Sequence, residues 1–528
     1  MRNVILLSFL FFFKLNFAQE TIGLVFNDIN KTKSNGYTLI NLISDTRTFL
    51  INNCGEVVHQ WSFPSDDARN YYLLENGNIF QSSGTYAEIR DWENNILWSI
   101  NYQTELGFRI HHDIQPLPNG NFLVLVRDNY TNTEMFAVGM DTSYPNNDLE
   151  LERIVEIEPI GTDSAKIVWE WKLFDHLVQD FDSSKPNYGI VANNPQLLNM
   201  NYDDGEGSNP IHANAIDYNP SLDQIAISAR HLKEVFVIDH STTTAQAASH
   251  SGGTYGKGGD FLWRWGNPEV YNKGTINDRK LGKQHDIKWI TEGPDKGKMS
   301  VFSNDGYGTN LTFSSVHIID QNDINGVYNS ASGKFLPNDY FWSWDGTILD
   351  EVMWGTAQCG VQIMSNGNAL INETSTGRIT EVDRDGNVIW VYIIPTGSNI
   401  NFDQFTEPVG NNAFRAHRYA EDYKGFEGKT FNNTGIIEDV NAISANCSNI
   451  LSVDNVFSDN LRVYPNPTNG YVNFNMSLDV INVYDLSGKN VLKKTNSETI
   501  NLENLKNGIY IIKVISDENY NVIKIIKN

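Results

Sequence analysis

The chain has 528 residues and a formal net charge of −25, and 12% of its residues are aromatic. Acidity on this scale, without any block of Lys and Arg, excludes binding to nucleic acid or to an anionic membrane surface, because both require basic residues that neutralise phosphates. The aromatic content argues against a disordered chain. We therefore expect a soluble, folded protein in a salty or extracellular setting.

The N-terminus has the pattern of a secretory signal. Arg2 precedes an apolar run from Val4 to Phe13, and Ala18 ends a short segment that is typical of a cleavage site. The apolar run is too short to span a bilayer, so we predict a signal peptide over residues 1–18. The three cysteines, Cys54, Cys359 and Cys447, make no disulfide framework; a Cys54–Cys359 bridge and buried free thiols are both open.

An apolar pair followed closely by tryptophan recurs six times in the middle of the chain. The copies are Val57-Val58-His59-Gln60-Trp61, Ile96-Leu97-Trp98, Ile167-Val168-Trp169-Glu170-Trp171, Phe261-Leu262-Trp263-Arg264-Trp265, Tyr340-Phe341-Trp342-Ser343-Trp344 and Val388-Ile389-Trp390-Val391-Tyr392. Between them lie segments that alternate polar and apolar residues around turns such as Asn119-Gly120, which is a strong hairpin signal. The repeat predicts an all-β fold, a six-bladed β-propeller over residues 19–440, with two stacked sandwiches as the alternative.

The C-terminal part reads as a separate module. A linker rich in Asn, Ser and Asp is predicted over residues 441–458, and short alternating strands separated by Gly turns predict a small β-sandwich over 459–528. The segments Tyr464-Pro465-Asn466-Pro467, Val483-Tyr484-Asp485 and Asn507-Gly508-Ile509-Tyr510 resemble the C-terminal sorting domain of the type IX secretion system. The resemblance implies the type IX secretion machinery as a partner and a secreted or cell-surface location.

Three histidines occupy equivalent places before three predicted hairpins. His112 lies seven residues before Asn119, His212 seven before Asn219, and His285 seven before Glu292. Equivalent positions in successive blades converge, so we expect the three imidazoles at one end of the central channel.

Hairpin pairing adds arginine to this group. A turn centred near Ser221 places Arg230 opposite His212, and the turn at Asn119-Gly120 places Arg127 opposite His112. A slip of one residue in either hairpin would turn the arginine to the other face.

Three imidazoles beside a guanidinium suit two kinds of ligand. Three histidines can hold zinc with a water in the fourth position, but a fixed cation beside a dication is repulsive. Arginine and histidine together suit a tetrahedral oxyanion, such as a phosphoryl or sulfuryl group. We expect no metal and no cofactor, and histidine itself becomes the candidate nucleophile.

The residues around these histidines resemble a known family. The segments His111-His112-Asp113-Ile114, His212-Ala213-Asn214-Ala215-Ile216, Ser228-Ala229-Arg230-His231, Gln284-His285-Asp286-Ile287 and Asn412-Ala413-Phe414-Arg415-Ala416 are similar to the bacterial arylsulfate sulfotransferases, over residues 36–429. The resemblance implies a six-bladed propeller that moves a sulfuryl group from a phenolic sulfate ester to a phenol. It implies no nucleotide donor and a sulfohistidine intermediate.

By the same resemblance, His285 is the expected nucleophile, and His112, His212 and Arg230 bind and stabilise the sulfuryl oxygens. His111 is an alternative to His112. Further substrate-binding candidates are Arg127, His111, Asn304 and Gln358. The expected partners are a phenolic sulfate donor and a phenolic acceptor, and a homodimer is compatible with the sequence.

Two other classes of function stay open at this stage. One is a secreted hydrolase or lyase that acts on an oxyanion ester in the same pocket. The other is a non-catalytic propeller that binds glycans or serves adhesion. Release of free sulfate without an acceptor would identify a hydrolase. Binding without turnover would identify a non-catalytic binding protein.

Overall fold

The computed structural model describes residues 21–28, 31, 36–64, 70–144, 148–202, 205, 207–306, 312–438, 462–485, 489–516 and 519–528. The chain divides into two compact units, Met1–Cys447 and Ser448–Asn528. The predicted signal peptide (1–18) and linker (441–458) lie outside the described residues. Within the described ranges, no helix combines the length and the apolar character that a membrane crossing requires.

The first unit is built from antiparallel sheets, of which six in the described residues have four or five strands. We number these sheets 1 to 6. They are sheet 1, β33-β2-β3-β4 (Ala416–Ala420, Gly36–Asn41, Arg47–Ile51, Val57–Ser62); sheet 2, β5 to β8 (Asn70–Leu73, Ile79–Ser82, Tyr86–Arg90, Ile96–Asn101); sheet 3, β9 to β12 (Ile110–Pro116, Phe122–Tyr130, Leu149–Ile160, Ser164–Lys172); sheet 4, β15 to β18 (Ala213–Asn219, Gln224–Ala229, Glu234–Asp239, Trp263–Trp265); sheet 5, β19-β20-β21-β24 (His285–Trp289, Met299–Ser303, Ser315–Ile319, Trp342–Trp344); and sheet 6, β27 to β30 with β1 (Gly360–Ile363, Ala369–Glu373, Arg378–Val382, Val388–Ile393, Gly23–Asn27). The all-β prediction is therefore confirmed.

Helices and two-stranded pairs occupy the connections. The helices in the described residues are short: α1 (Tyr102–Glu105), α2 (Asn132–Ala137), α3 (Thr244–Ala247), and 3-10 turns at Leu173–His176, Val191–Asn193, Ile276–Asp278, Thr374–Thr376 and Lys424–Phe426. The two-stranded pairs are β13–β14 (Leu177–Val178, Leu198–Asn199), β22–β23 (Ser330–Ala331, Lys334–Phe335), β25–β26 (Thr347–Ile348, Glu351–Val352) and β31–β32 (Thr396–Gly397, Ile400–Asn401).

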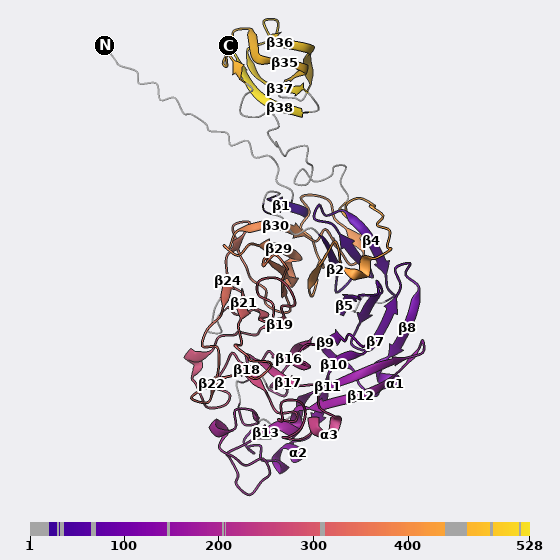
Figure 1. The fold of residues 1–528 in the computed structure, drawn as a ribbon, viewed down its shortest axis with the longest axis vertical. Coiled ribbons are helices and arrows are strands. Elements are labelled where there is room, and N and C mark those ends of the chain that lie inside the picture. Colours follow the sequence, from indigo (N-terminus) through magenta and orange to yellow (C-terminus); the bar gives the residue numbers. More distant parts are fainter. Residues whose placement is uncertain are drawn as a thin grey trace, which may run out of the picture. The chain divides into compact units, whose positions relative to one another are not determined.

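Two sheets are completed by strands from opposite parts of the sequence. In sheet 6, β1 pairs with β30, so that Gly23 lies opposite Ile393, and Figure 1 shows the two strands side by side. In sheet 1, β2 pairs with β33, so that Gly36 lies opposite Ala420. These long-range pairs tie the early part of this unit to its late part.

The repeated tryptophans link each sheet to the next one. They lie in β4, β8, β12, β18, β24 and β30, and their indole N–H groups donate to groups of the following sheet or of its connections. The bonds are Trp61 to the Asp91 carbonyl (3.2 Å), Trp98 to Ser164 (2.8 Å), Trp171 to Gly259 (2.8 Å), Trp263 to Leu336 (2.7 Å), Trp344 to Gly386 (3.1 Å) and Trp390 to Asn53 (2.8 Å). The last bond returns from sheet 6 to sheet 1, so the six-fold repeat in the sequence corresponds to a closed series of contacts.

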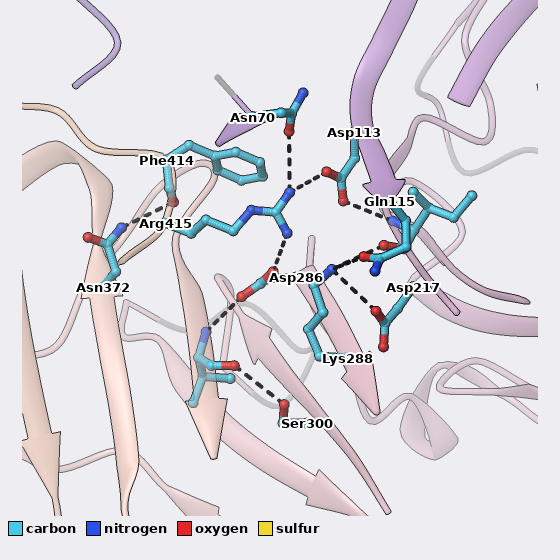
Figure 2. A network of polar contacts seen from close by, with 12 residues as sticks. Asn70, Asp113, Gln115, Asp217, Asp286, Lys288, Ser300, Asn372, Phe414 and Arg415 are labelled. Carbon is cyan, nitrogen blue, oxygen red and sulfur yellow. Dashed lines mark hydrogen bonds and ion pairs between the residues drawn. The ribbon is translucent and has the colours of Figure 1, made fainter. Parts of the chain in front are cut away.

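Buried aspartates make a second set of links between the first strands. Asp113 of sheet 3 accepts the backbone N–H of Ile216 in sheet 4 (3.0 Å), and Asp286 of sheet 5 accepts that of Val361 in sheet 6 (3.0 Å). Arg415 pairs with both aspartates, as Figure 2 shows. One buried cation therefore joins the start of sheet 1 to sheets 3 and 5.

The second unit contains one five-stranded antiparallel sheet in its described residues. Its strands are β34 (Val463–Tyr464), β35 (Tyr471–Tyr484), β36 (Asn490–Asn501), β37 (Gly508–Ser516) and β38 (Asn519–Lys527). Val472, Ile481 and Ile512 are among the residues of its buried core. The β-sandwich expected here, and the domain boundaries at 440 and 459, stay predictions.

Candidate active site

The three predicted histidines stand at the start of the first strands of sheets 3, 4 and 5. His112 lies in β9, His212 directly precedes β15, and His285 opens β19. His112 and His212 adopt positive φ angles of 67° and 48°, a left-handed conformation that is uncommon for non-glycine residues. The irregular backbone breaks the strand register where the imidazoles lie.

His112 and His212 are in direct contact. Their Nε2 atoms lie 2.9 Å apart, and the Asn209 side-chain amide donates to Nδ1 of His212 (3.0 Å). Burial, helped by the neighbouring His231, His111 and Arg230, lowers the pKa of His212 to about 2. A neutral His212 whose Nδ1 accepts carries its proton on Nε2, so it donates to His112.

His285 is held in one tautomer by its neighbours. Its Nδ1 lies 2.7 Å from Oδ1 of Asn304, and the amide nitrogen of Asn304 donates to the carbonyls of Gly355 (2.7 Å) and Gln358 (3.0 Å). Because the Asn304 oxygen can only accept, Nδ1 carries the proton and Nε2 the lone pair. The backbone N–H of Gln358 donates to that Nε2 at 3.2 Å.

The protonation state of His285 follows from burial and charge. Burial lowers the pKa of this imidazole to about 4, against the Asn304 bond that raises it, and the Arg230 cation lowers it further. His285 is therefore neutral at neutral pH and offers an unprotonated nitrogen.

Arg230 lies where the hairpin pairing predicted. Its backbone N–H donates to the carbonyl of His212 (3.2 Å), which confirms that the two residues face each other across the hairpin. Its Nη1 contacts Nε2 of His231 (2.6 Å), and Nδ1 of His231 reaches the carbonyl of Asn209 (2.7 Å). His231 and Asn209 were missed as site residues, although His231 adjoins Arg230 in the sequence.

His111 is the second histidine of sheet 3 at this place. Its Nδ1 contacts Oε2 of Glu152 (3.1 Å), whose other oxygen accepts the backbone N–H of Ala213 in the next sheet (2.8 Å). Its buried Nε2 has no hydrogen-bond partner, and its ring centroid lies 5.3 Å from that of His212. His111 therefore presents a polar atom that needs a partner beside the other two imidazoles.

Arg127 does not face His112, and this expectation is wrong. The register of β9 with β10 shifts between Val124 and Val126, so that Val126 lies opposite Ile110. The Arg127 side chain is exposed and pairs with Glu150 on β11. The irregularity at His112 is what moves the arginine away from the predicted place.

Of the two alternatives left open for Cys54 and Cys359, the structure excludes a bridge between them. Cys359 is buried and free, whereas Cys54 is disulfide-bonded. Burial raises the pKa of the Cys359 thiol to about 12, so this residue next to Gln358 is an inert thiol rather than a second nucleophile.

The residues could hold either an oxyanion or a metal. His111, His112 and His212 each offer a nitrogen, and these atoms lie within 4.8 Å of one another, a spacing that a metal ion can bridge. The cation of Arg230, which lowers the pKa of both His212 and His285, disfavours a second cation and favours an anionic group.

Below the histidines, a buried network of charges holds the strands in register. Figure 2 shows Arg415 between Asn70, Asp113 and Asp286, and Lys288 close to Asp217. Two of these three aspartates, Asp113 and Asp286, directly follow the site histidines His112 and His285. The repeated His-Asp-Ile motif thus combines one residue of the site with one residue that supports it.

Fold and site together define an all-β protein with a cluster of imidazoles, of which His212 and His285 are neutral, and one arginine where its first strands begin. The sequence matches the arylsulfotransferase (ASST) family over residues 24–316, so the chain belongs to that family, which supports sulfuryl transfer in general. Residues 462–528 match the secretion system C-terminal sorting domain, which supports a secreted or cell-surface location. No curated protein matches the chain.

Solved structures are similar only at a distance. They include a Bacteroides caccae protein of unknown function (12% identity, 68% of this chain and 94% of that one, TM-score 0.36) and a putative 6-phosphogluconolactonase from Bacteroides fragilis (10%, 74% and 99%, 0.35). Another is an inactive virginiamycin B lyase from Staphylococcus aureus with quinupristin (11%, 69% and 86%, 0.32). At these TM-scores the similarity carries no argument about function.

Proposed function

We propose that this chain is a six-bladed β-propeller enzyme that transfers a sulfuryl group from a phenolic sulfate ester to a phenol, with His285 as nucleophile. The observation that carries the proposal is His285 itself. It is buried and neutral, and Asn304 leaves the lone pair on Nε2. Family membership supplies the class of group that is transferred.

In the first half-reaction, the Nε2 lone pair attacks sulfur and the bond from sulfur to the phenolic oxygen breaks. The leaving phenolate has a conjugate acid of pKa about 10, so it departs more easily with a proton. Neutral His212 cannot lose its Nε2 proton without forming an imidazolate, so it stabilises the departing oxygen by a hydrogen bond, and the phenolate takes its proton from solvent.

In the second half-reaction, a phenol attacks the sulfur, the N–S bond breaks and His285 regains its lone pair. The acceptor phenol releases its proton to solvent, which replaces the proton that the leaving phenolate took, so protons balance over the cycle. Transfer in two halves predicts ping-pong kinetics.

The charge that develops on the sulfuryl oxygens requires fixed donors. Arg230 supplies a cation whose Nη1 is oriented by His231, and the backbone N–H of Gln358 already points to Nε2 of His285. Hydrogen-bond donors that are already in place need not reorganise during the reaction. Such preorganised donors usually contribute most of the stabilisation of a charged transition state.

Replacing the nucleophile tests the proposal. We expect His285→Asn to lower turnover from an aryl sulfate to a phenol by at least about a thousand-fold, since the nitrogen that attacks sulfur is lost. The control is His317→Asn, which removes another buried histidine of sheet 5 that contacts Ser315 and Ser343 rather than the site. This variant should keep turnover within a few-fold.

Two results would contradict the proposal. Turnover of His285→Asn equal to the wild type would remove His285 as nucleophile. Release of free sulfate at the same rate with and without a phenol would identify a hydrolase instead of a transferase.

A further inference from the structure

We propose that His176, His250 and Asp260 form a binding site for a divalent transition metal of the Zn²⁺ type, and that this metal fastens two neighbouring sheets. His176 ends the 3-10 turn Leu173–His176 that follows β12 of sheet 3. His250 and Asp260 lie in the connection between β17 and β18 of sheet 4, which also contains α3. Figure 1 shows α3 beside β12, where the two sheets adjoin.

The three side chains converge on one carboxylate oxygen. Nδ1 of His176 lies 2.8 Å from Oδ1 of Asp260, and Nδ1 of His250 lies 2.7 Å from the same oxygen. The three candidate ligand atoms all lie within 4.8 Å of one another. None of these residues belongs to the candidate active site.

The hydrogen bonds of His176 require a proton or a metal ion between its Nδ1 and Asp260. Its Nε2 lies 2.8 Å from the carbonyl oxygen of Ala247, which can only accept, so Nε2 carries a proton. In the neutral ring, Nδ1 then presents its lone pair to the lone pairs of Asp260 at 2.8 Å. Either a second proton or a metal ion resolves this contact.

Three features favour the metal over the proton. A metal-bound histidine characteristically donates its other ring N–H to a carbonyl, which is the bond from His176 to Ala247. A second imidazole nitrogen, that of His250, is directed to the same oxygen. His250 is 59% exposed, so a water from solvent can take a fourth position.

The surroundings hold His176 in place. Its ring is fully buried and stacks on Trp171 at a centroid distance of 5.6 Å. A side-chain Cβ at Gly259 would lie 2.5 Å from Nε2 of His176 and 2.1 Å from the Ala247 oxygen, so this position accepts only glycine. The packing of the backbone against the ring therefore holds the His176 imidazole in its orientation.

Two imidazole nitrogens and one carboxylate oxygen are ligands that Zn²⁺ prefers among divalent ions, with an open fourth position. At metal–ligand distances of about 2.0–2.2 Å, ligand atoms on a tetrahedral ion lie about 3.3 Å apart. Binding therefore requires the rings to withdraw from Asp260 by roughly half an ångström, which the exposed His250 permits.

Zn²⁺ titration of the full chain, after dialysis against a chelator, tests the site by calorimetry and by the metal content after desalting. We expect one Zn²⁺ per chain and a higher thermal unfolding temperature with Zn²⁺ bound. His250→Ala and Asp260→Asn should each weaken binding by at least about tenfold, because even partners of metal ligands contribute about 10–100-fold.

The matched control is His112→Ala, which removes a histidine from the other group of three, His111, His112 and His212. This variant should still bind one Zn²⁺. The proposal is overturned if the wild type binds no Zn²⁺, which would leave a proton between His176 and Asp260. It is also overturned if His250→Ala, whose exposed side chain is not needed for folding, binds Zn²⁺ as tightly as the wild type, or if His112→Ala alone loses the ion.

Discussion

At the residue scale, the account depends on which nitrogen of His285 carries a proton. The Asn304 side chain decides this, because its oxygen accepts from Nδ1 while its amide is fixed by the carbonyls of Gly355 and Gln358. Asn304 is thus a positioning residue that acts through His285. The sequence predicted Asn304 as a substrate-binding residue, whereas these contacts indicate that it orients His285.

Replacement of Asn304 by aspartate tests this positioning. Asn304→Asp places a carboxylate against Nδ1, which favours the imidazolium and raises the pKa of His285 from about 4 by one unit or more. The wild-type rate should stay level from pH 8 to about 5 and fall only as His285 is protonated near pH 4. In the variant this acid limb should move to higher pH, whereas a purely structural loss would lower the rate equally at every pH.

At the element scale, the sequence patterns predicted the strands better than their pairing. The tryptophan motif and the Asn-Gly turns identified β4, β8, β12, β18, β24 and β30 and the hairpins between them. They did not show that β1 completes sheet 6 or that β2 pairs with β33. Such pairs join residues hundreds of positions apart, and no local sequence pattern predicts which distant strands will pair.

The limits of local sequence patterns also apply to the predicted positions of Arg230 and Arg127. Arg230 reaches its predicted place through a register shift. Near the turn the pairing is offset by one residue from the predicted count, with Asn219 opposite Gln224, and the shift between Ala213 and Ala215 puts Ala213 opposite Ala229. Arg127 was misplaced because the register shifts between Val124 and Val126. Both shifts lie at or beside a histidine with positive φ, His112 or His212, and the turn residues of the two hairpins do not reveal them.

At the scale of the whole molecule, buried neutral histidines make the folded protein sensitive to acid. Burial lowers the pKa of His285 to about 4 and that of His317 to about 3. The unfolded chain, with a histidine pKa near 6.5, therefore binds protons first as the pH falls. Each such histidine lowers the free energy of unfolding by up to about 1.4 kcal/mol per pH unit between pH 6.5 and its folded pKa.

Denaturant unfolding of the wild type and of His317→Asn between pH 7.5 and 4.5 measures this effect for one histidine. The free energy of unfolding of the wild type should fall relative to that of the variant as the pH drops below 6.5. Only the wild type has a histidine at position 317 that is protonated in the unfolded chain and not in the folded protein. Subtracting the free energy of unfolding of the variant from that of the wild type at each pH removes the contribution of all other titrating groups. A difference that stays constant over this range would show that His317 is protonated as readily in the folded as in the unfolded protein.

The net charge of −25 and the proposed anionic substrate are compatible once charge is considered locally. Arg230 lies beside the site histidines, and the cations of Arg415 and Lys288 are held among the first strands below them. Substrate choice follows the field at the site, whereas net charge describes mainly the solvated surface.

The central claim is that His285 carries the sulfuryl group between donor and acceptor. Mass spectrometry of peptides from the protein mixed with an aryl sulfate, without acceptor, tests it most directly. We predict an added mass of about 80 Da, that of SO₃, on the peptide with His285, lost when a phenol is added and absent in His285→Asn. Turnover without any adduct on His285, or with the adduct on another residue, would contradict the account.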